Sequence, residues 1–170
     1  GVYIMTETTL VNLVSTWGYF AIAAGMFLEG LTLPFPGAAT VLLAGTLAVR
    51  SNLSLSMIAV CAALGYCLGT LIPYYLAKYG GRKLLFKYGR YIFLSTKTLQ
   101  TAESWFDRYG NWVVCFGRPF FFGNYISLLA GLATMRLNTF LLYTLLGILP
   151  WSIVLSALGF YFGRAALSFW

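Results

Sequence analysis

Long runs without a charged side chain dominate the chain. Two of them, residues 51–77 and 137–163, continue without a strong break, and each contains one interior proline, Pro73 or Pro150. A helix needs about 20 predominantly apolar residues to cross a bilayer, and both runs exceed that length. The pattern therefore predicts two membrane-spanning helices.

The run over residues 8–49 is also apolar, but its centre is interrupted. Glu29 is its single charge, and Pro34, Pro36 and Gly37 follow closely. Prolines and glycine at this density end a helix. Irregular backbone at membrane depth is tolerated only where protein or a wet cavity satisfies its polar groups. We therefore expect a re-entrant hairpin, which dips into the bilayer and returns to the same side.

A second interrupted run covers residues 109–135. It is broken by Gly-Arg-Pro at 117–119 and by Gly-Asn at 123–124, and Arg118 is its single charge. The same argument from unsatisfied backbone groups applies, so we expect a second re-entrant hairpin.

Residues 78–108 have a different character. Apolar residues alternate there with basic ones at roughly helical spacing, which is typical of an amphipathic segment at the membrane surface. An ordinary solvated loop is the alternative. The basic residues of this segment are Lys78, Arg82, Lys83, Lys87, Arg90, Lys97 and Arg108.

The two halves of the chain show the same features in the same order. Each has a break with one charge, then the letters LLAG (42–45 and 128–131), then a helix with an interior proline, then Gly-Arg at 81–82 or 163–164. A hairpin followed by one spanning helix, repeated once, leaves the two halves inverted relative to each other, as in many transporters.

These elements predict a single all-α polytopic membrane domain over residues 5–170. We expect an inverted repeat, residues about 8–82 and 108–164, with two re-entrant helical hairpins, two or more spanning helices and an interfacial amphipathic segment. Residues 1–4 precede Met5 and are interpreted as a remnant of the expression vector.

Charge counting orients this arrangement. One side carries the seven basic residues of the amphipathic segment and Arg136, whereas the other carries only Arg50 and Arg164. Cytoplasmic loops of membrane proteins are enriched in Lys and Arg. The side with the amphipathic segment is therefore predicted to be cytoplasmic.

Composition agrees with a membrane location. Hydrophobic residues make up 60% of the 170 residues and charged residues only 9%, whereas a soluble domain carries roughly 25% charged residues. The net charge is +7. Nucleic-acid binding is one interpretation of that charge, but its clustering fits attraction to anionic lipid head groups better.

Several kinds of site are excluded by residue type. The chain has no histidine and four acidic residues, and its three cysteines lie in apolar stretches without a CxxC motif. No Ser-His-Asp, Cys-His or phosphate-loop pattern is present. We therefore expect no metal, no cofactor and no enzymatic activity, and we interpret Cys61, Cys67 and Cys115 as packing residues.

Arg118 and Glu29 are the sharpest candidates for function. An arginine at bilayer depth costs at least a few kcal/mol, so it is usually paired or functional. Its guanidinium offers planar donors that match phosphate. Glu29 could hold an amine or carry a proton through a transport cycle. The alternatives are snorkelling of Arg118 to the interface and a structural ion pair between the two residues.

The hairpin tips supply further candidates for substrate binding. Backbone N–H groups at helix N-termini attract anions, and an asparagine adds amide hydrogen bonds. Simple turn formation is the alternative for the tips. Tyr74 is a candidate for contact with a head group, with packing as its alternative. The tip candidates are Pro34, Pro36, Gly37, Gly123 and Asn124.

Ordered motifs over essentially the whole chain resemble the DedA superfamily, whose domain is also called VTT or SNARE-associated Golgi. They include EGLTLPFPG at 29–37, GYCLGTLIPYYLAKYGGRKLLFKYGRY at 65–91, RYGNWVVCFGRP at 108–119 and FLLYTLLGILPW at 140–151. The resemblance implies inverted re-entrant hairpins and lipid translocation, with a location in the bacterial plasma membrane. Members of this family move undecaprenyl phosphate or glycerophospholipids.

The chain departs from the family pattern at three places. The acidic residue that often follows Pro-Gly in the first hairpin is Ala38 here, and the Gly-Asp of the first spanning helix is Gly-Thr at 69–70. The second arginine, often found shortly after the first, is missing from residues 120–124. Glu29 and Arg118 are the positions that match.

One cation suits a zwitterionic phosphodiester, whereas a phosphomonoester favours two. We therefore expect a flippase- or scramblase-like lipid transporter whose substrate is a zwitterionic glycerophospholipid such as phosphatidylethanolamine. Transport of undecaprenyl phosphate and a non-transporting, membrane-organising role are the alternatives. The expected partners are a membrane lipid and the bilayer, not nucleic acid, and homo-oligomerisation is left open.

Overall fold

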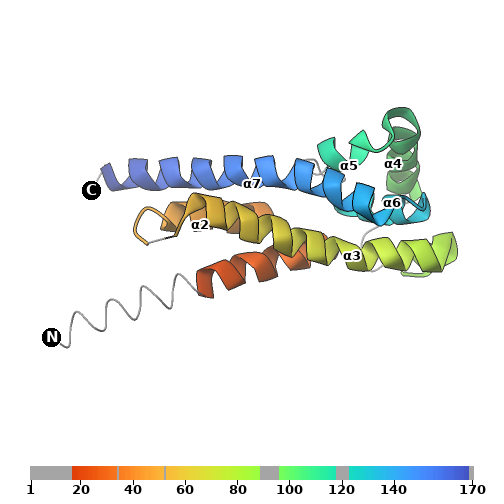
Figure 1. The fold of residues 1–170 in the computed structure, drawn as a ribbon, viewed down its shortest axis with the longest axis horizontal. Helices are drawn as coiled ribbons and strands as arrows, with labels where there is room; N and C mark the ends of the chain where they lie inside the picture. Colours follow the sequence, from red (N-terminus) through yellow and green to blue (C-terminus); the bar gives the residue numbers. More distant parts are fainter. Residues whose placement is uncertain (1–16, 34, 52, 89–95, 118–122, 169–170) are drawn as a thin grey trace.

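A computed structural model describes residues 17–33, 35–51, 53–88, 96–117 and 123–168. This part of the chain is all-helical (Figure 1). Its helices are residues 17–30, α2 (Gly37–Leu47), α3 (Leu55–Tyr88), α4 (Thr96–Tyr109), α5 (Trp112–Phe116), α6 (Gly123–Leu132) and α7 (Leu137–Ser168).

The two long helices, α3 and α7, run along the long axis of the molecule (Figure 1). Leu55–Lys83 and Leu137–Ser168 are long and apolar enough to cross a membrane. Large apolar side chains on α3 point outward every fourth residue, as a lipid-facing helix requires; these are Leu64, Leu68, Ile72 and Leu76. The structure therefore has two helices that are long and apolar enough to span a membrane, at the positions that the sequence predicted.

The ends of these helices differ from the prediction. At Gly81 the backbone does leave the helical region (φ 62°, ψ −170°), but α3 resumes and reaches Tyr88. Gly163 does not end α7 at all. A Cβ at Gly163 would lie 2.9 Å from the Thr46 carbonyl oxygen of α2. This glycine therefore serves close helix packing rather than helix termination.

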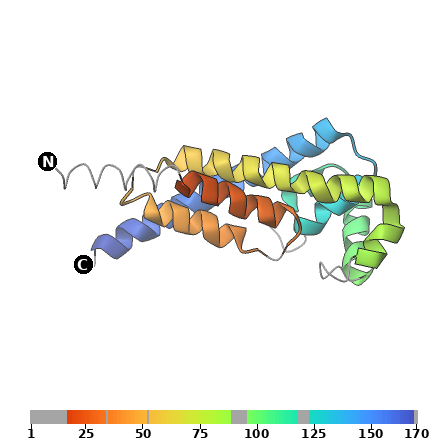
Figure 2. The ribbon, with the colours of Figure 1, turned by 90° about the horizontal axis from the view of Figure 1, so that it is seen from below.

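The first helical hairpin consists of residues 17–30 and α2, and a turn at Leu31 and Thr32 ends its first arm. Figure 2 shows its arms side by side and antiparallel, with the turn about midway along the long axis. The first arm ends because Thr32 adopts the left-handed region (φ 65°), and its N–H donates to the Glu29 carbonyl at 3.1 Å. The helix break is confirmed where the sequence predicted it.

The helices α5 and α6 lie where the sequence predicted the arms of the second hairpin. Its first arm is shorter than expected, because Tyr109 belongs to α4 and Gly110, with φ 57°, makes the turn into α5. The Gly110 N–H donates to the Phe106 carbonyl at 2.8 Å and so closes the last turn of α4. Residues 118–122, which include Arg118, lie outside the described residues.

Each hairpin packs its returning arm on the long helix of the other half. A Cβ at Gly45 of α2 would lie 2.1 Å from the Ser156 carbonyl oxygen of α7, and one at Gly131 of α6 would lie 2.2 Å from the Tyr74 carbonyl oxygen of α3. Only glycine permits backbones to approach this closely. The helices α2 and α7 are thus held together, as are α6 and α3.

The entering arms pack on the long helix of their own half. A Cβ at Gly65 of α3 would lie 2.2 Å from the Ala23 carbonyl oxygen, and one at Gly147 of α7 would lie 2.4 Å from the Cys115 carbonyl oxygen. In both long helices the contact with the other half follows nine residues later, at Tyr74 and Ser156. The two halves therefore make corresponding contacts at matching positions.

The helix α4 lies across one end of the molecule (Figure 1) and is amphipathic, as expected for an interfacial segment. An ion pair between Arg82 and Glu103, 2.5 Å from nitrogen to oxygen, links it to the end of α3. The connecting residues 89–95 lie outside the described residues.

Candidate functional site

Glu29 lies in the last turn of the first arm and is half-buried. Its carboxylate presses against Gly37, the first residue of α2. A Cβ at Gly37 would lie 1.9 Å from Glu29 Oε2 and 2.9 Å from Met26 Sδ. No residue with a side chain fits this position unless Glu29 moves.

The location of this carboxylate has an electrostatic meaning. The N-terminus of a helix carries partial positive charge from N–H groups that have no intrahelical partner. At the N-cap of α2, Pro36 makes no side-chain hydrogen bond to the helix. The protein's own carboxylate thus lies where the sequence predicted that the anionic part of a substrate would bind. Any anion arriving at this N-terminus meets Glu29 there.

The turn that presents Glu29 is fixed against α3. A Cβ at Gly30 would lie 2.6 Å from the Tyr66 carbonyl oxygen, and one at Gly69 would lie 2.2 Å from the Phe27 carbonyl oxygen. Thr70 is fully buried and donates its hydroxyl to the Cys67 carbonyl at 2.7 Å. The backbone that positions Glu29 therefore has little freedom to shift.

Tyr74 is placed in the core. It is fully buried, its hydroxyl donates to the Met135 carbonyl, and its ring stacks on Phe140 with centroids 4.7 Å apart. The Lys78 Nζ lies 3.4 Å from the same hydroxyl. These contacts favour the packing interpretation of Tyr74 over contact with a head group.

The other predicted site residues are only partly brought together. Glu29, Pro36 and Gly37 share the first hairpin turn. Gly123 and Asn124 begin α6, the returning arm of the second hairpin. Pro34 and Arg118 fall outside the described residues, so their predicted roles stay predictions.

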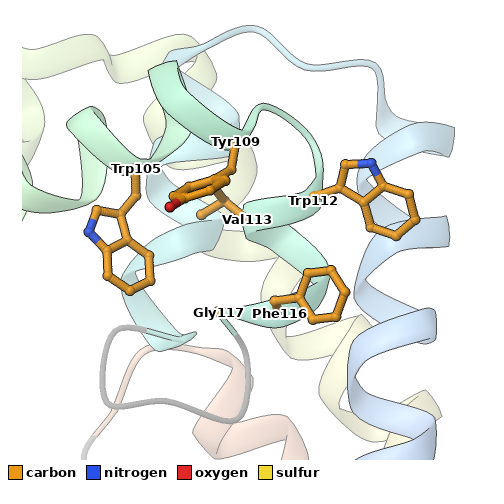
Figure 3. Close-up of a pocket in the computed structure, with 6 residues that line it drawn as sticks. All are labelled: Trp105, Tyr109, Trp112, Val113, Phe116 and Gly117. Atoms are coloured by element: carbon orange, nitrogen blue, oxygen red, sulfur yellow. The ribbon is translucent and has the colours of Figure 1, made fainter.

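An aromatic groove between α4 and α5, which we did not predict, has a volume of about 610 Å³ (Figure 3). The positions of its aromatic residues follow helical spacing at i, i+4, i+7 and i+11, which is a signal that the sequence contained. The lining residues are Trp105, Tyr109, Trp112, Val113, Phe116 and Gly117.

Two long apolar helices, two helical hairpins and an amphipathic helix at one end define a polytopic helical membrane protein. The chain belongs to the VTT-domain (DedA) family, whose sequence pattern matches residues 18–161. No solved structure matches the chain.

Two similar proteins are named undecaprenyl phosphate transporter A. That of Bacillus subtilis is 30% identical over 91% of this chain and 79% of its own length. That of Staphylococcus aureus is 30% identical over 90% of this chain and 78% of its own length. An "alkaline phosphatase-like protein" of Lactococcus lactis is also 30% identical, over 90% of this chain and 74% of its own length.

These similarities and the apolar helices identify a protein of the bacterial plasma membrane. Its relatives are named as transporters or as membrane proteins, apart from the phosphatase-like name. The membrane location and the family predicted from the sequence are confirmed.

Proposed function

We propose that this protein moves a phosphate-bearing lipid between the leaflets of the membrane, with the head group passing the hairpin turns. The observation that carries the proposal is the half-buried carboxylate of Glu29, which lies against Gly37 in the first hairpin. The turn of that hairpin lies about midway along the long axis (Figure 2). A carboxyl group inside the membrane costs free energy, so such a group usually has a functional role. The names of the two Bacillus and Staphylococcus relatives support a lipid cargo.

Re-entrant hairpins in an inverted repeat are part of this proposal. The helices α2 and α6 have 11 and 10 residues. At 1.5 Å per residue they are about 15 Å long, roughly half of the hydrocarbon thickness. The corresponding glycine contacts of the two halves support an internal repeat. Opposed hairpins of this kind let a head group move while the lipid tails stay in the bilayer.

In this mechanism Arg118 binds the phosphate and Glu29 holds an amine or a proton. Asn124 adds hydrogen bonds at the start of α6. Pro34, Pro36, Gly37 and Gly123 shape the two turns, whereas Tyr74 holds the second half against α3. The Glu29 carboxylate also interacts with the partial positive charge at the N-terminus of α2, and a competing anion would have to displace it there.

Two substrates follow from different observations. The absence of a second arginine from residues 120–124 favours a zwitterionic head group such as that of phosphatidylethanolamine. The names of the relatives favour undecaprenyl phosphate as the second candidate. A non-transporting role as a membrane organiser remains the alternative from another class.

Leaflet exchange in reconstituted liposomes tests the proposal directly. Phosphatidylethanolamine and undecaprenyl phosphate, each labelled, are compared with phosphatidylcholine in the same vesicles. We expect Arg118→Ala to slow exchange at least about ten-fold, because a hydrogen bond to a charged group contributes about 1.5–3 kcal/mol. Glu29→Gln should slow it as well, whereas the exposed cation Arg164 serves as the control in Arg164→Ala.

Each alternative predicts a different result in this assay. Exchange no faster than in empty liposomes for all three lipids would leave only the organising role. Exchange that is unchanged in Arg118→Ala would remove Arg118 from the site. Faster exchange of undecaprenyl phosphate than of phosphatidylethanolamine would favour undecaprenyl phosphate as the substrate, and the reverse would favour phosphatidylethanolamine.

A further inference from the structure

The aromatic groove lies between the last turn of α4 and α5 (Figure 3). Trp105 and Tyr109 come from α4, and Trp112 and Phe116 come from α5. Its volume of about 610 Å³ falls within the range of sites that bind small molecules, about 300–1,000 Å³. The groove is therefore large enough for part of a lipid molecule.

Ring contacts hold the walls of the groove in place. Trp112 stacks on Phe116 with centroids 5.7 Å apart and meets the Tyr143 ring of α7 edge-on at 5.3 Å. Trp105 meets Tyr109 edge-on at 6.3 Å. These contacts form a preorganised surface, so a ligand would not have to order it on binding.

The groove is exposed although its walls are apolar. The exposed fractions of Trp105, Trp112 and Phe116 are 43%, 52% and 64%. Tryptophan and tyrosine are enriched where a membrane meets water, because one end of each side chain is apolar and the other polar. Such walls suit a hydrocarbon chain that begins near the membrane surface.

A cation lies beside this apolar surface. The guanidinium carbon of Arg108 is 5.5 Å from the centroid of the Tyr109 ring, which forms one wall. The neighbouring carboxylate, Asp107, lines a different cavity together with Arg82 and Glu103. A groove with apolar walls, one of which is in contact with an arginine, is complementary to a phosphate joined to a hydrocarbon chain.

We propose that this groove binds one phospholipid with a net negative head group, such as phosphatidylglycerol, from the leaflet on the side of α4. The hydrocarbon chain would lie against Trp105, Trp112 and Phe116, and the phosphate would contact Arg108. This binding site lies on α4 and α5 and reaches Gly117, next to the second hairpin break, but lipid binding there does not require translocation. Its failure would leave the proposed function standing, and the reverse also holds.

Quenching of tryptophan fluorescence by lipids with brominated chains measures this binding. One variant keeps Trp105 and Trp112 and replaces Trp17, Trp151 and Trp170 with phenylalanine. A reference variant keeps only Trp17, which is 64% exposed on the first hairpin. Both are reconstituted with equal mole fractions of brominated phosphatidylglycerol or brominated phosphatidylcholine.

We expect quenching titrations to give an occupancy of the groove about five-fold higher for phosphatidylglycerol than for phosphatidylcholine. One arginine near anionic lipid contributes about 1 kcal/mol, which corresponds to about that factor. Trp17 should show no such preference. Arg108→Gln should abolish the preference, whereas Lys83→Gln, which removes an exposed cation from α3, should leave it intact.

Equal quenching by the two lipids at Trp105 and Trp112 would mean that only bulk lipid covers the groove, and it would overturn the proposal. So would a preference that survives Arg108→Gln. Native mass spectrometry provides a second measurement that needs no tryptophan replacement. There, the fraction of protein that retains phosphatidylglycerol should fall about five-fold in Arg108→Gln and stay unchanged in Lys83→Gln.

Discussion

The contact between Glu29 and Gly37 joins two ends of helices across one turn. The first arm brings the carboxylate, and α2 brings a backbone without a side chain and with a positive N-terminal end. The carboxylate can therefore lie at this position because Gly37 has no side chain, and not only because the N-terminus of α2 is positive. This makes Gly37 a positioning residue for Glu29.

We predict that Gly37→Ala slows lipid exchange about as much as Glu29→Gln does. The added methyl group would lie 1.9 Å from Glu29 Oε2, so the carboxylate has to move. The atoms that the methyl group meets are the ends of the flexible Glu29 and Met26 side chains, so the free energy of unfolding should change by less than about 1 kcal/mol. Exchange in liposomes and thermal unfolding in detergent measure the two effects.

Gly18→Ala is the matched control for Gly37→Ala. A Cβ at Gly18 would meet Leu53 at 3.7 Å, which is an ordinary contact. This variant should keep its exchange rate and its unfolding temperature. If Gly37→Ala behaved like Gly18→Ala, then the contact with Glu29 would have no role in transport.

The sequence located the first turn but not its internal contact. Pro36, Gly37 and the nearby charge marked the helix break. The approach of Glu29 to Gly37 depends on a left-handed residue at Thr32, and threonine gives no sign of that conformation in a sequence. Tyr74 carried two interpretations because an apolar run does not show which face of the helix is buried.

At the scale of elements, glycines decide which helices pack together. A Cβ at Gly159 of α7 would lie 2.0 Å from the Leu42 carbonyl oxygen of α2. This contact adds to those of Gly45 and Gly163, so that α2 and α7 approach closely along much of α2. Hydrophobic burial alone does not hold helices together in lipid, and close packing takes its place.

We predict that Gly159→Ala lowers the free energy of unfolding by about 1–3 kcal/mol, because a methyl group does not fit against a backbone carbonyl. Thermal or denaturant unfolding in detergent micelles measures this loss. The neighbouring Leu158→Ala is the control, because Leu158 is exposed on the outer face of α7. Equal stability of the two variants would contradict the close contact with α2.

The ion pair that links α3 to α4 should contribute little. The side chain of Arg82 is 64% exposed, and exposed pairs typically contribute about 0–1 kcal/mol. We expect Glu103→Gln to change the unfolding free energy by less than about 1 kcal/mol, with the effect vanishing at high salt. A larger loss, unaffected by salt, would show that the Arg82–Glu103 contact fixes the position of α4.

The lengths of apolar runs predicted the helices well, and their ends less well. A run of about 20 apolar residues has few alternatives to a spanning helix, so α3 and α7 were found. Glycine has two uses, turns and close packing, and the sequence alone does not separate them. Gly81 and Gly110 bend the chain, but Gly163 lies inside α7 against α2.

For the whole molecule, the distribution of charge gives a test of orientation. The helix α4 and the C-terminal part of α3 lie at one end of the long axis, and the turn from α2 to α3 lies at the other (Figures 1 and 2). The first end carries Lys87 and Arg108, and the second carries Arg50. Positive charge favours the cytoplasm for the first end.

We predict that a cysteine at Arg50 reacts with a membrane-impermeant maleimide in spheroplasts, whereas one at Lys87 reacts only after the membrane is opened. The three native cysteines are first replaced by alanine. Both positions are exposed, so access from one side of the membrane is the only difference tested. The opposite labelling pattern would invert the topology.

The exchange of packing partners between the halves has a consequence for synthesis. The chain emerges from the ribosome in order, and α2 appears long before α7, its packing partner. The first hairpin is therefore in the membrane before α7 is made. During that time α7 does not yet cover the glycine face of α2, which includes Gly45. The last helix closes the structure, so a ribosome that stops before α7 should leave a product that membrane proteases recognise.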